Sequence, residues 1–543
     1  MTSQKLPERP NLEQLKKHAK SLLHSAQAKE PPALSRFLTL PTFAKKSVEE
    51  LGALSLALHD AQSVIAREHG FASWNALREH VEEHSLSFSA AVDEFMRCAT
   101  GGAPARAFRL LELHPGIAKA NLQTALVLGD IAAVEARLNG HPELATQSGG
   151  IQNWDPLLYV CHNCLSGDAP TRKTGLVAIA RRLLSLGANP NAQYHWQWHP
   201  ELPRTALWAA LCSVSHLPLA ETLLEAGANP TDGVSLHITA GGGILEAVEL
   251  LHRYGVNVNG IPGGVPPLRY ILGWGTNHAG PRWLLEHGAD ANLSWGERND
   301  APIHIAAQRW DVAMVELLAH HGADLLRRRA DGCTAHTVAE LQGNHAVATW
   351  LLAHGAKDEL SPLERFIAAC ARGDRAAADA MLQTHPALRT ELRKDHHLML
   401  HVPAERGAAA VLETMLACGF DPRVKDKDGV TALHRAAMAG RTEAVRVLIA
   451  AGAPLNALDN MFSASPLIWA VEGWSSHGSR EPESIEAKTS AVSSDPNYPA
   501  VARLLIAAGS PVDWNPPEST PGPERIQETL IELRRAAERL EAT

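Results

Sequence analysis

Cysteine and histidine side chains come close together in two short stretches of the sequence, where they could bind a metal ion. Cys161 and Cys164 are separated by two residues, and His195 and His199 by three. A closed zinc site needs four such ligands held tetrahedrally, and a single CxxC pair within a predicted helix is a weak signal. Both cysteines also fall at the spacing of core-facing residues. The pattern therefore favours packing, and we expect neither a metal nor a cofactor.

Aromatic and histidine side chains between residues 194 and 310 could instead form a binding surface. The densest stretch is residues 194–199, with the sequence YHWQWH, whose two Trp and two His have no evident core role in a predicted loop. Exposed aromatic side chains often anchor interfaces. Packing of these rings against neighbouring segments is the alternative. The candidate binding residues are His195, Trp196, Trp198, His199, Trp208, Tyr270, Trp274, His278, Trp295, Arg298 and Trp310.

A catalytic motif is not evident. The sequence contains no GxSxG nucleophile turn and no HExxH zinc-protease motif. Its glycine run, residues 241–243, has no following Lys-Ser or Lys-Thr pair and no predicted strand before it, so it does not resemble a phosphate-binding loop. The 28 histidines leave room for an acid–base site that the sequence does not locate. We therefore expect a protein that is not an enzyme.

The element that must position the candidate residues is a short repeated unit. Its signature is a paired aliphatic run, then Gly and a small residue, then a polar turn, as in LLEHGADAN at residues 284–292. Gly255, Gly288, Gly322 and Gly355 of this signature lie 33, 34 and 33 residues apart. A fixed period of about 33 residues indicates a solenoid, and we count about twelve units. Such stacks present surfaces and seldom enclose deep pockets.

The clearest unit spans residues 428–460 and predicts two helices joined by a turn. Thr431 can cap the first helix, which Gly440 ends, and Gly452 ends the second. With its period and the sequence TALHRA at residues 431–436, this unit closely resembles the ankyrin repeat. The resemblance covers about residues 91–515 and implies an all-α fold, an ankyrin-repeat solenoid with helical caps at both ends.

The resemblance also implies which residues are structural and which make contacts. The histidine of the motif, as in His304 and His434, hydrogen-bonds locally at the start of the first helix, whereas the turns and concave helices contact partners. Four units have an aromatic residue near this position, which we align with the histidine. The rings either fill the groove between repeats or line a binding surface. The four residues are Tyr159, Trp208, Tyr270 and Trp469.

Several positions test the repeat alignment. Trp310 stands where the clearest unit has Gly440, and a bulky side chain there implies backbone strain unless the local geometry differs. Leu433 and Leu448 should be buried between neighbouring repeats. Trp196, Trp198, Trp274 and Trp295 should project from the turns, with at least two of them exposed to solvent.

The regions outside the repeats have a different pattern. Residues 1–90 predict a helical leader, and RPNLEQLKKHAKSLL within it resembles the segment ahead of the repeats in some bacterial ankyrin proteins. We expect a cap on the first repeat, which solenoids need. A helix-turn-helix DNA reader is the alternative, but basic and acidic residues are nearly balanced there. Residues 516–543 predict a C-terminal capping helix, and residues 165–176 and 473–499 predict insertions between helices.

Composition narrows the class of protein. The formal net charge is −9 and the pI is near 6.3, which argues against a general nucleic-acid binder. No stretch of about 18 apolar residues is present to span a membrane. The seven cysteines sit mostly at small apolar positions, as reduced buried thiols would in the cytoplasm. We expect a cytoplasmic, non-catalytic scaffold that binds a protein partner; binding of a small molecule, peptide or sugar in the Trp- and His-rich groove is the alternative. The sequence predicts no oligomeric state.

Overall fold

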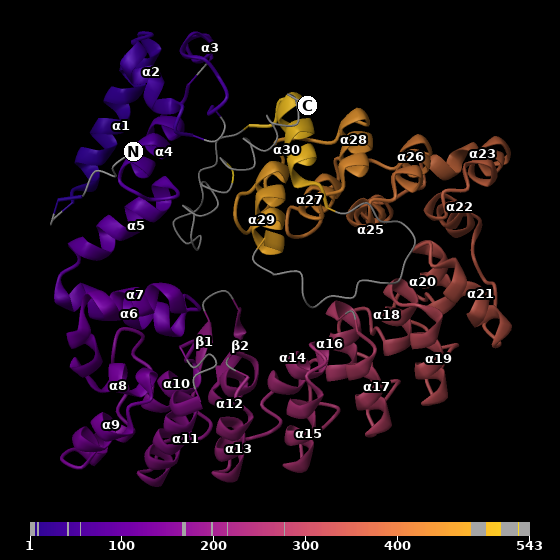
Figure 1. Ribbon diagram of the computed structural model, residues 1–543. Helices are drawn as coiled ribbons and strands as arrows, with labels where there is room; N and C mark the ends of the chain where they lie inside the picture. Colours follow the sequence, from indigo (N-terminus) through magenta and orange to yellow (C-terminus); the bar gives the residue numbers. More distant parts are fainter. Residues whose placement is uncertain are drawn as a thin grey trace. The chain divides into compact units, whose positions relative to one another are not determined.

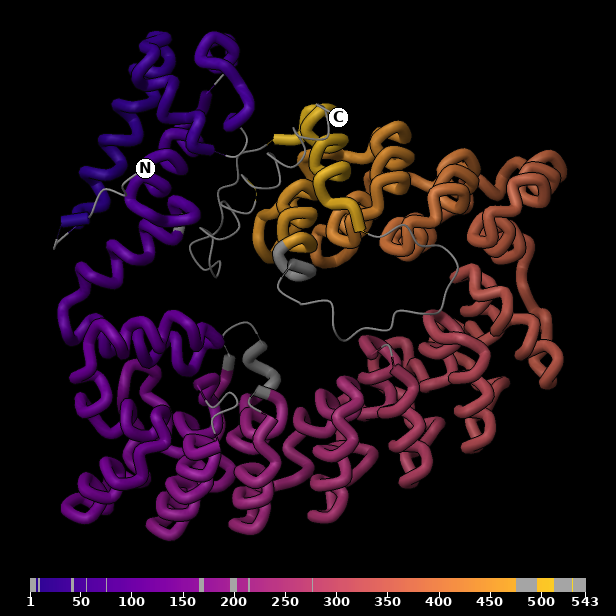
Figure 2. The backbone as a smooth tube through the Cα atoms, viewed as in Figure 1, coloured from indigo at the N-terminus to yellow at the C-terminus, as the bar shows by residue number. Residues whose placement is uncertain are grey.

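The computed structural model describes residues 6–7, 10–40, 43–54, 56–165, 170–196, 199–213, 215–275, 277–478, 496–511 and 530. The chain divides into two compact units, Met1–Gly264 and Val265–Thr543. Figure 1 labels the helices and strands, and Figure 2 follows the backbone through them.

The first unit begins with a small helical leader that has its own hydrophobic core. Asn11 caps the first helix by accepting a hydrogen bond from the Gln14 N–H (3.2 Å). Leu15, Ala19 and Leu22 follow at helical spacing and are buried. The leader helices are α1 (Leu12–Gln27), α2 (Pro31–Phe37), α3 (Val48–Gly52), α4 (Leu58–Glu68) and α5 (Trp74–Ser85).

An ion-pair cluster joins the leader to the first repeat. Glu83 of α5 is only 2% exposed and accepts hydrogen bonds from Arg109 of α7 (Pro104–Leu113), with Nη2 2.9 Å from Oε1. Arg106 approaches the same carboxylate at 3.5 Å. A buried carboxylate is costly unless it is paired, so this contact fixes how α5 sits on α7. The capping role of the leader stays a prediction.

After the leader, the described residues of the first unit form five helix pairs, each a helix–turn–helix unit. Short 3-10 or π turns supplement some of them: η1 (Pro115–Lys119), η2 (Pro142–Ala145) and η3 (Ala209–Ser213). The paired helices are α6 (Phe88–Thr100) with α7 (Pro104–Leu113), α8 (Leu122–Leu128) with α9 (Ile131–Leu138), α10 (Pro156–Cys161) with α11 (Pro170–Ser185), α12 (Ala206–Trp208) with α13 (Leu217–Glu225), and α14 (Ser235–Gly241) with α15 (Leu245–Arg253).

A β-hairpin replaces the predicted loop at residues 194–199. Strands β1 (Gln193–Trp196) and β2 (His199–Thr205) pair antiparallel, with Tyr194 opposite Arg204 and a register shift between His195 and Trp196. Three isolated bridges elsewhere, such as Trp295 with Asp300, mark shorter versions of the same turn. The described residues thus contain one two-stranded sheet, a small addition to the predicted all-α fold.

The described residues of the second unit form seven further helix pairs, which follow one another along the chain in Figure 1. Two short elements, α24 (Lys394–His397) and η5 (Leu398–Leu400), lead into α25, and η4 (Pro386–Arg389) follows α23. The pairs are α16 (Pro267–Trp274) with α17 (Ala279–Glu286), α18 (Pro302–Arg309) with α19 (Val312–His320), α20 (Ala335–Leu341) with α21 (His345–Ala353), α22 (Pro362–Ala371) with α23 (Arg375–Thr384), α25 (His401–Arg406) with α26 (Ala409–Ala417), α27 (Ala432–Met438) with α28 (Thr442–Ala450), and α29 (Pro466–Gly478) with α30 (Tyr498–Ala507).

The motif histidines hold the start of the first helix in each of two repeats. In α27 the Nδ1 atom of His434 accepts a hydrogen bond from the Thr431 N–H (3.1 Å), and Nε2 then donates to the Ala464 carbonyl of the next repeat (3.2 Å). His304 repeats this arrangement with Ala301 and Arg327. The local hydrogen bonding expected of these histidines is therefore confirmed.

The hydrophobic core of the second unit lies between the helices of successive pairs. Leu433 and Leu448 are fully buried in a cluster that runs from α22 to α30, so their predicted burial is confirmed. Gly452 ends α28 with φ of 79°, a conformation that a residue with a side chain adopts at a cost. The paired helices and the buried stripe between them make an all-α solenoid of helix–turn–helix repeats.

The two predicted insertions have different boundaries in the structure. Residues 170–176 form the first turns of the long helix α11, because Pro170 can start a helix and the following residues favour its continuation. The second insertion is shorter than expected, because α29 continues to Gly478 and α30 begins at Tyr498. The predicted C-terminal capping helix lies outside the described residues, except for Leu530.

Candidate aromatic binding surface

The candidate residues of the first unit lie on or beside the β-hairpin. His195 of β1 is exposed and lies opposite Pro203 of β2. Trp196 ends β1 and His199 begins β2, but their side chains lie outside the described residues, as does all of Trp198. The predicted contact role of these three side chains stays a prediction.

Aromatic rings pack together beneath the hairpin. The rings of Trp154 and Tyr194 stack with centroids 4.5 Å apart, and buried His162 contacts Tyr194 at 5.0 Å. Trp208, the third residue of α12, is half-buried with the Arg204 guanidinium 4.1 Å from its ring centre. These rings fill space between adjacent repeats, so the packing interpretation applies to Trp208.

The cysteines of the CHNC sequence serve packing as well. Cys161 is fully buried in α10, and the Cys164 thiol donates to the Cys98 carbonyl at 3.2 Å. Burial lowers the pKa of His162 to about 3, so this imidazole is neutral at pH 7. Across the residues that the structure describes, no group of three or more His, Cys, Asp or Glu side chains is arranged to hold a metal ion.

The second unit presents two aromatic side chains on one face of α16. Tyr270 and Trp274 are the fourth and eighth residues of this helix, and residues four apart share a helix face. Trp274 is 73% exposed, whereas Tyr270 is half-buried. The prediction that Trp274 lies in a turn is wrong, because α16 continues through Gly273 and ends at Trp274.

A third aromatic side chain comes from the turn that precedes α18. Trp295 is 37% exposed, and the guanidinium of Arg269 lies 5.2 Å from its ring centre. Arg298 is exposed in the same turn. The exposure predicted for at least two tryptophans is therefore confirmed for Trp274 and Trp295. We call Tyr270, Trp274 and Trp295 the aromatic strip.

Trp310 does not belong to the exposed surface. It is 7% exposed, and its indole N–H donates to the Leu272 carbonyl at 2.8 Å. Its backbone is extended, with φ of −100°, so the strain expected at a glycine position does not arise. His278 is partly exposed, but its ring contacts Trp310 edge-on at 5.1 Å and its Nε2 hydrogen-bonds Asp311 at 2.9 Å. These two residues hold adjacent repeats together.

Two arginines beside the strip were not among the predicted binding residues. Arg269 is the third residue of α16, the position that His304 and His434 occupy in α18 and α27. Tyr270 is therefore one residue beyond the histidine position, and the same correction applies to Tyr159 and Trp469. Counting from the proline that starts each helix would have revealed this shift.

Arg309 is the second missed neighbour of the strip. It is exposed at the end of α18, and its Nη1 donates to the carbonyl of Gly273, next to Trp274. As the eighth residue of its helix, it matches Trp274 in the preceding repeat. The strip is thus flanked by arginines from two adjacent repeats.

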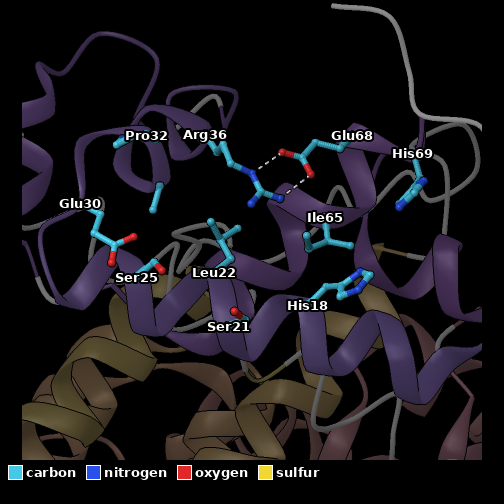
Figure 3. Close-up of a pocket in the computed structure, with 11 residues that line it drawn as sticks. His18, Ser21, Leu22, Ser25, Glu30, Pro32, Arg36, Ile65, Glu68 and His69 are labelled. Carbon is cyan, nitrogen blue, oxygen red and sulfur yellow. Dashed lines mark hydrogen bonds and ion pairs between the residues drawn. The ribbon is translucent and has the colours of Figure 1, made fainter.

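A separate pocket of about 430 Å³ lies in the leader, between α1, α2 and α4 (Figure 3). Arg36 and Glu68 point toward one another across it and form two hydrogen bonds of 2.7 and 2.8 Å. His18, Ser21 and Ser25 line it from α1. Because the positive charge of Arg36 is paired with the negative charge of Glu68, the pocket is polar but has no strong excess of one charge.

Comparison with known proteins identifies the repeats. The family model described as "Ankyrin repeats (3 copies)" matches residues 398–479, and the model "Ankyrin repeat" matches residues 298–329. Among the described helices, none is long and apolar enough to cross a membrane.

Curated proteins are similar over parts of the chain. SH3 and multiple ankyrin repeat domains protein 2 from Homo sapiens is 30% identical over 175 residues, which cover 31% of this chain and 9% of that protein. E3 ubiquitin-protein ligase KEG from Arabidopsis thaliana is 26% identical over 272 residues, which cover 48% of this chain and 15% of that protein. The 2-5A-dependent ribonuclease from Mus musculus is 45% identical over 62 residues, which cover 11% of this chain and 8% of that protein. The chain thus spans at most 15% of the length of these relatives.

The solved human ASB11 ankyrin repeat domain is 25% identical and covers 44% of this chain, and 99% of its own length is matched with a TM-score of 0.33. These relatives are eukaryotic, so the predicted bacterial type stays a prediction. The two family matches and the helix pairs of both units together identify this chain as one that carries ankyrin repeats in an all-α solenoid.

Proposed function

We propose that this chain is a non-catalytic scaffold that binds a protein partner through the aromatic strip of its second unit. The observation that carries the proposal is the exposure of Trp274 and Trp295 in two adjacent repeats. Large exposed rings supply much of the binding energy of interfaces when a partner covers them. A solenoid also holds them in place before binding, which limits the ordering cost.

Capture experiments with the full chain test this proposal. Immobilised wild type, the double variant Trp274→Ala/Trp295→Ala and the control variant Trp350→Phe are incubated with the same cell extract. Trp350 is a suitable control because it lies on α21 and donates to Glu316 at 2.9 Å. We expect proteins that wild type and control retain but the double variant loses. Equal retention by all three would exclude the strip as the main interface.

A second candidate function is the binding of a small polar molecule, and the leader pocket is the observation that favours it. Its volume of about 430 Å³ falls within the range of small-molecule sites. Leu22 and Ile65 give it an apolar floor beneath the polar groups. A thermal-shift screen of polar metabolites, repeated with Ser21→Leu, would test it: stabilisation that the variant loses is the supporting result.

The cellular location of the protein and the exclusion of nucleic acid as a partner are also proposals. We infer a cytoplasmic protein, since all seven cysteines are free thiols, as expected in a reducing compartment. We infer that nucleic acid is not its partner, since the formal net charge is −9. Fractionation of cells that express the tagged chain, and a gel-shift assay with random DNA, would test the two statements.

A further inference from the structure

Three arginines surround the aromatic strip without a carboxylate partner. Arg269, Arg298 and Arg309 form no ion pair with any residue that the structure describes. Elsewhere in the second unit, nine arginines do, as Arg365 with Asp358 at 2.8 Å and Arg446 with Glu443 at 3.1 Å. Arginines that lie beside exposed aromatic rings, and form no ion pair within the described residues, leave donors for an incoming ligand.

The individual guanidinium groups retain much of their hydrogen-bonding capacity. The Nε atom of Arg269 is buried without a hydrogen-bond partner, although its guanidinium covers the ring of Trp295. Arg309 has five N–H donors and gives one bond, to the neutral carbonyl of Gly273. Arg298 is exposed in the turn, where Glu297 is the adjacent acidic residue.

Beside the strip, Arg269, Arg298 and Arg309 outnumber Glu297, and Asp300 of the same turn is paired with Arg329 at 3.4 Å. This local excess of positive charge contrasts with the formal net charge of −9 for the whole chain. Carboxylates form short, bidentate bonds with arginine, and aliphatic side chains pack on indole rings. The strip offers both kinds of contact.

We propose that the aromatic strip binds an acidic peptide segment, in which carboxylates flank an apolar side chain. The apolar side chain packs on Trp274, and the carboxylates pair with Arg298 and Arg309. This inference rests on the proposed protein-binding function and adds the chemistry of the partner to it. The local excess of arginine is the charge complementarity that selects an acidic partner.

Selection from random displayed peptides tests the inference with no partner known in advance. Peptides of about 12 residues, which extend about 40 Å, are selected on the immobilised full chain. Selected peptides are then measured against wild type, Trp274→Ala/Trp295→Ala, Arg298→Glu/Arg309→Glu and the control Arg446→Glu on α28. Circular dichroism of each variant establishes that its helices are retained.

The expected result is a set of peptides rich in Asp and Glu that require the strip. The double arginine reversal should weaken them by about tenfold or more, and the control should leave them unchanged. Affinity should also fall as salt rises from about 50 to 300 mM. If the selected peptides need the strip but are neutral or basic, the inference of an acidic ligand is wrong, while the proposed protein-binding function remains. Selection of no peptide, or only of peptides that bind the Trp274→Ala/Trp295→Ala variant equally well, would overturn the proposed function as well.

Discussion

The guanidinium of Arg269 lies 5.2 Å from the ring centre of Trp295, which comes from the following repeat. The same relationship recurs in the last two repeats, where Arg435 lies 5.8 Å from the ring centre of Trp469. A cation over an indole face is attracted by the ring's negative face. In both places the pair spans two repeats, so the arginine of one repeat helps to hold an aromatic side chain of the next.

Trp274 should dominate the fluorescence that a soluble quencher can reach. Its exposed fraction is 73%, against 7% for Trp310. We expect Trp274→Phe to lower the acrylamide-accessible fraction of the emission. Trp310→Phe should leave that fraction nearly unchanged. Similar changes in both variants would contradict the position of Trp274 on the surface.

Trp310→Phe should destabilise the second unit by about 0.5–1.5 kcal/mol, the usual value of one hydrogen bond. The substitution removes the indole N–H that donates to the Leu272 carbonyl at 2.8 Å and leaves that acceptor without its partner. Urea denaturation measures the change. Trp350→Phe is the matched control, because its indole bonds to Glu316 near solvent and water can replace the contact. An equal loss in both variants would count against the buried bond.

Leu448→Ala should cost about 2–5 kcal/mol, the range for truncation of a buried leucine. Leu448 is fully buried within the cluster between α22 and α30. In a solenoid the loss can appear as separate unfolding of neighbouring repeats, so denaturation is followed by circular dichroism and by tryptophan emission together. Leu458→Ala, at an exposed position of the same region, should change stability by no more than about 0.5 kcal/mol. A silent Leu448→Ala would refute the packing.

His434 should make the second unit less stable as the pH falls from about 6.5 to 4. Burial lowers the pKa of this histidine to about 4, whereas an unfolded chain has a value of about 6.5. Between these values the unfolded state binds a proton that the folded state does not, so stability is lost with falling pH. The slope is about 1.4 kcal/mol per pH unit, and the full effect is at most about 3 kcal/mol.

The variant His434→Asn isolates that contribution, because carboxylates titrate in the same range. Urea denaturation of both proteins at several pH values between 4 and 7 gives the difference. We expect the variant to be less stable at pH 7 and to lose less stability on acidification. Parallel curves for the two proteins would show that His434 does not titrate as proposed.

The repeats could be predicted because each turn depends on local residue types. A period of about 33 residues, a capping threonine and a helix-ending glycine are all visible in one unit. The β-hairpin at residues 193–205 could not be predicted in this way. It replaces a turn that is longer than in the neighbouring repeats, and its pairing depends on residues that have no signature of their own.

The candidate surface was predicted less well than the fold. Trp274 lies between two glycines, which suggested a turn, but the packed helix α16 extends past Gly273. Trp310 was expected to strain a glycine position, yet its extended backbone leads directly into Asp311, which caps α19. Arg269 was missed because it occupies the histidine position of the motif. In each case contacts with a neighbouring repeat decide the outcome, and no single unit of sequence contains them.

The bridging histidines limit how far the repeats can be treated as interchangeable modules. His434 binds its own helix start through Nδ1 and the Ala464 carbonyl of the next repeat through Nε2. A deletion that ends the chain between these residues removes the acceptor and leaves a buried donor unsatisfied. Deletion, duplication or grafting of repeats should therefore use boundaries after residue 464, so that each transferred block includes the carbonyl that its last histidine needs.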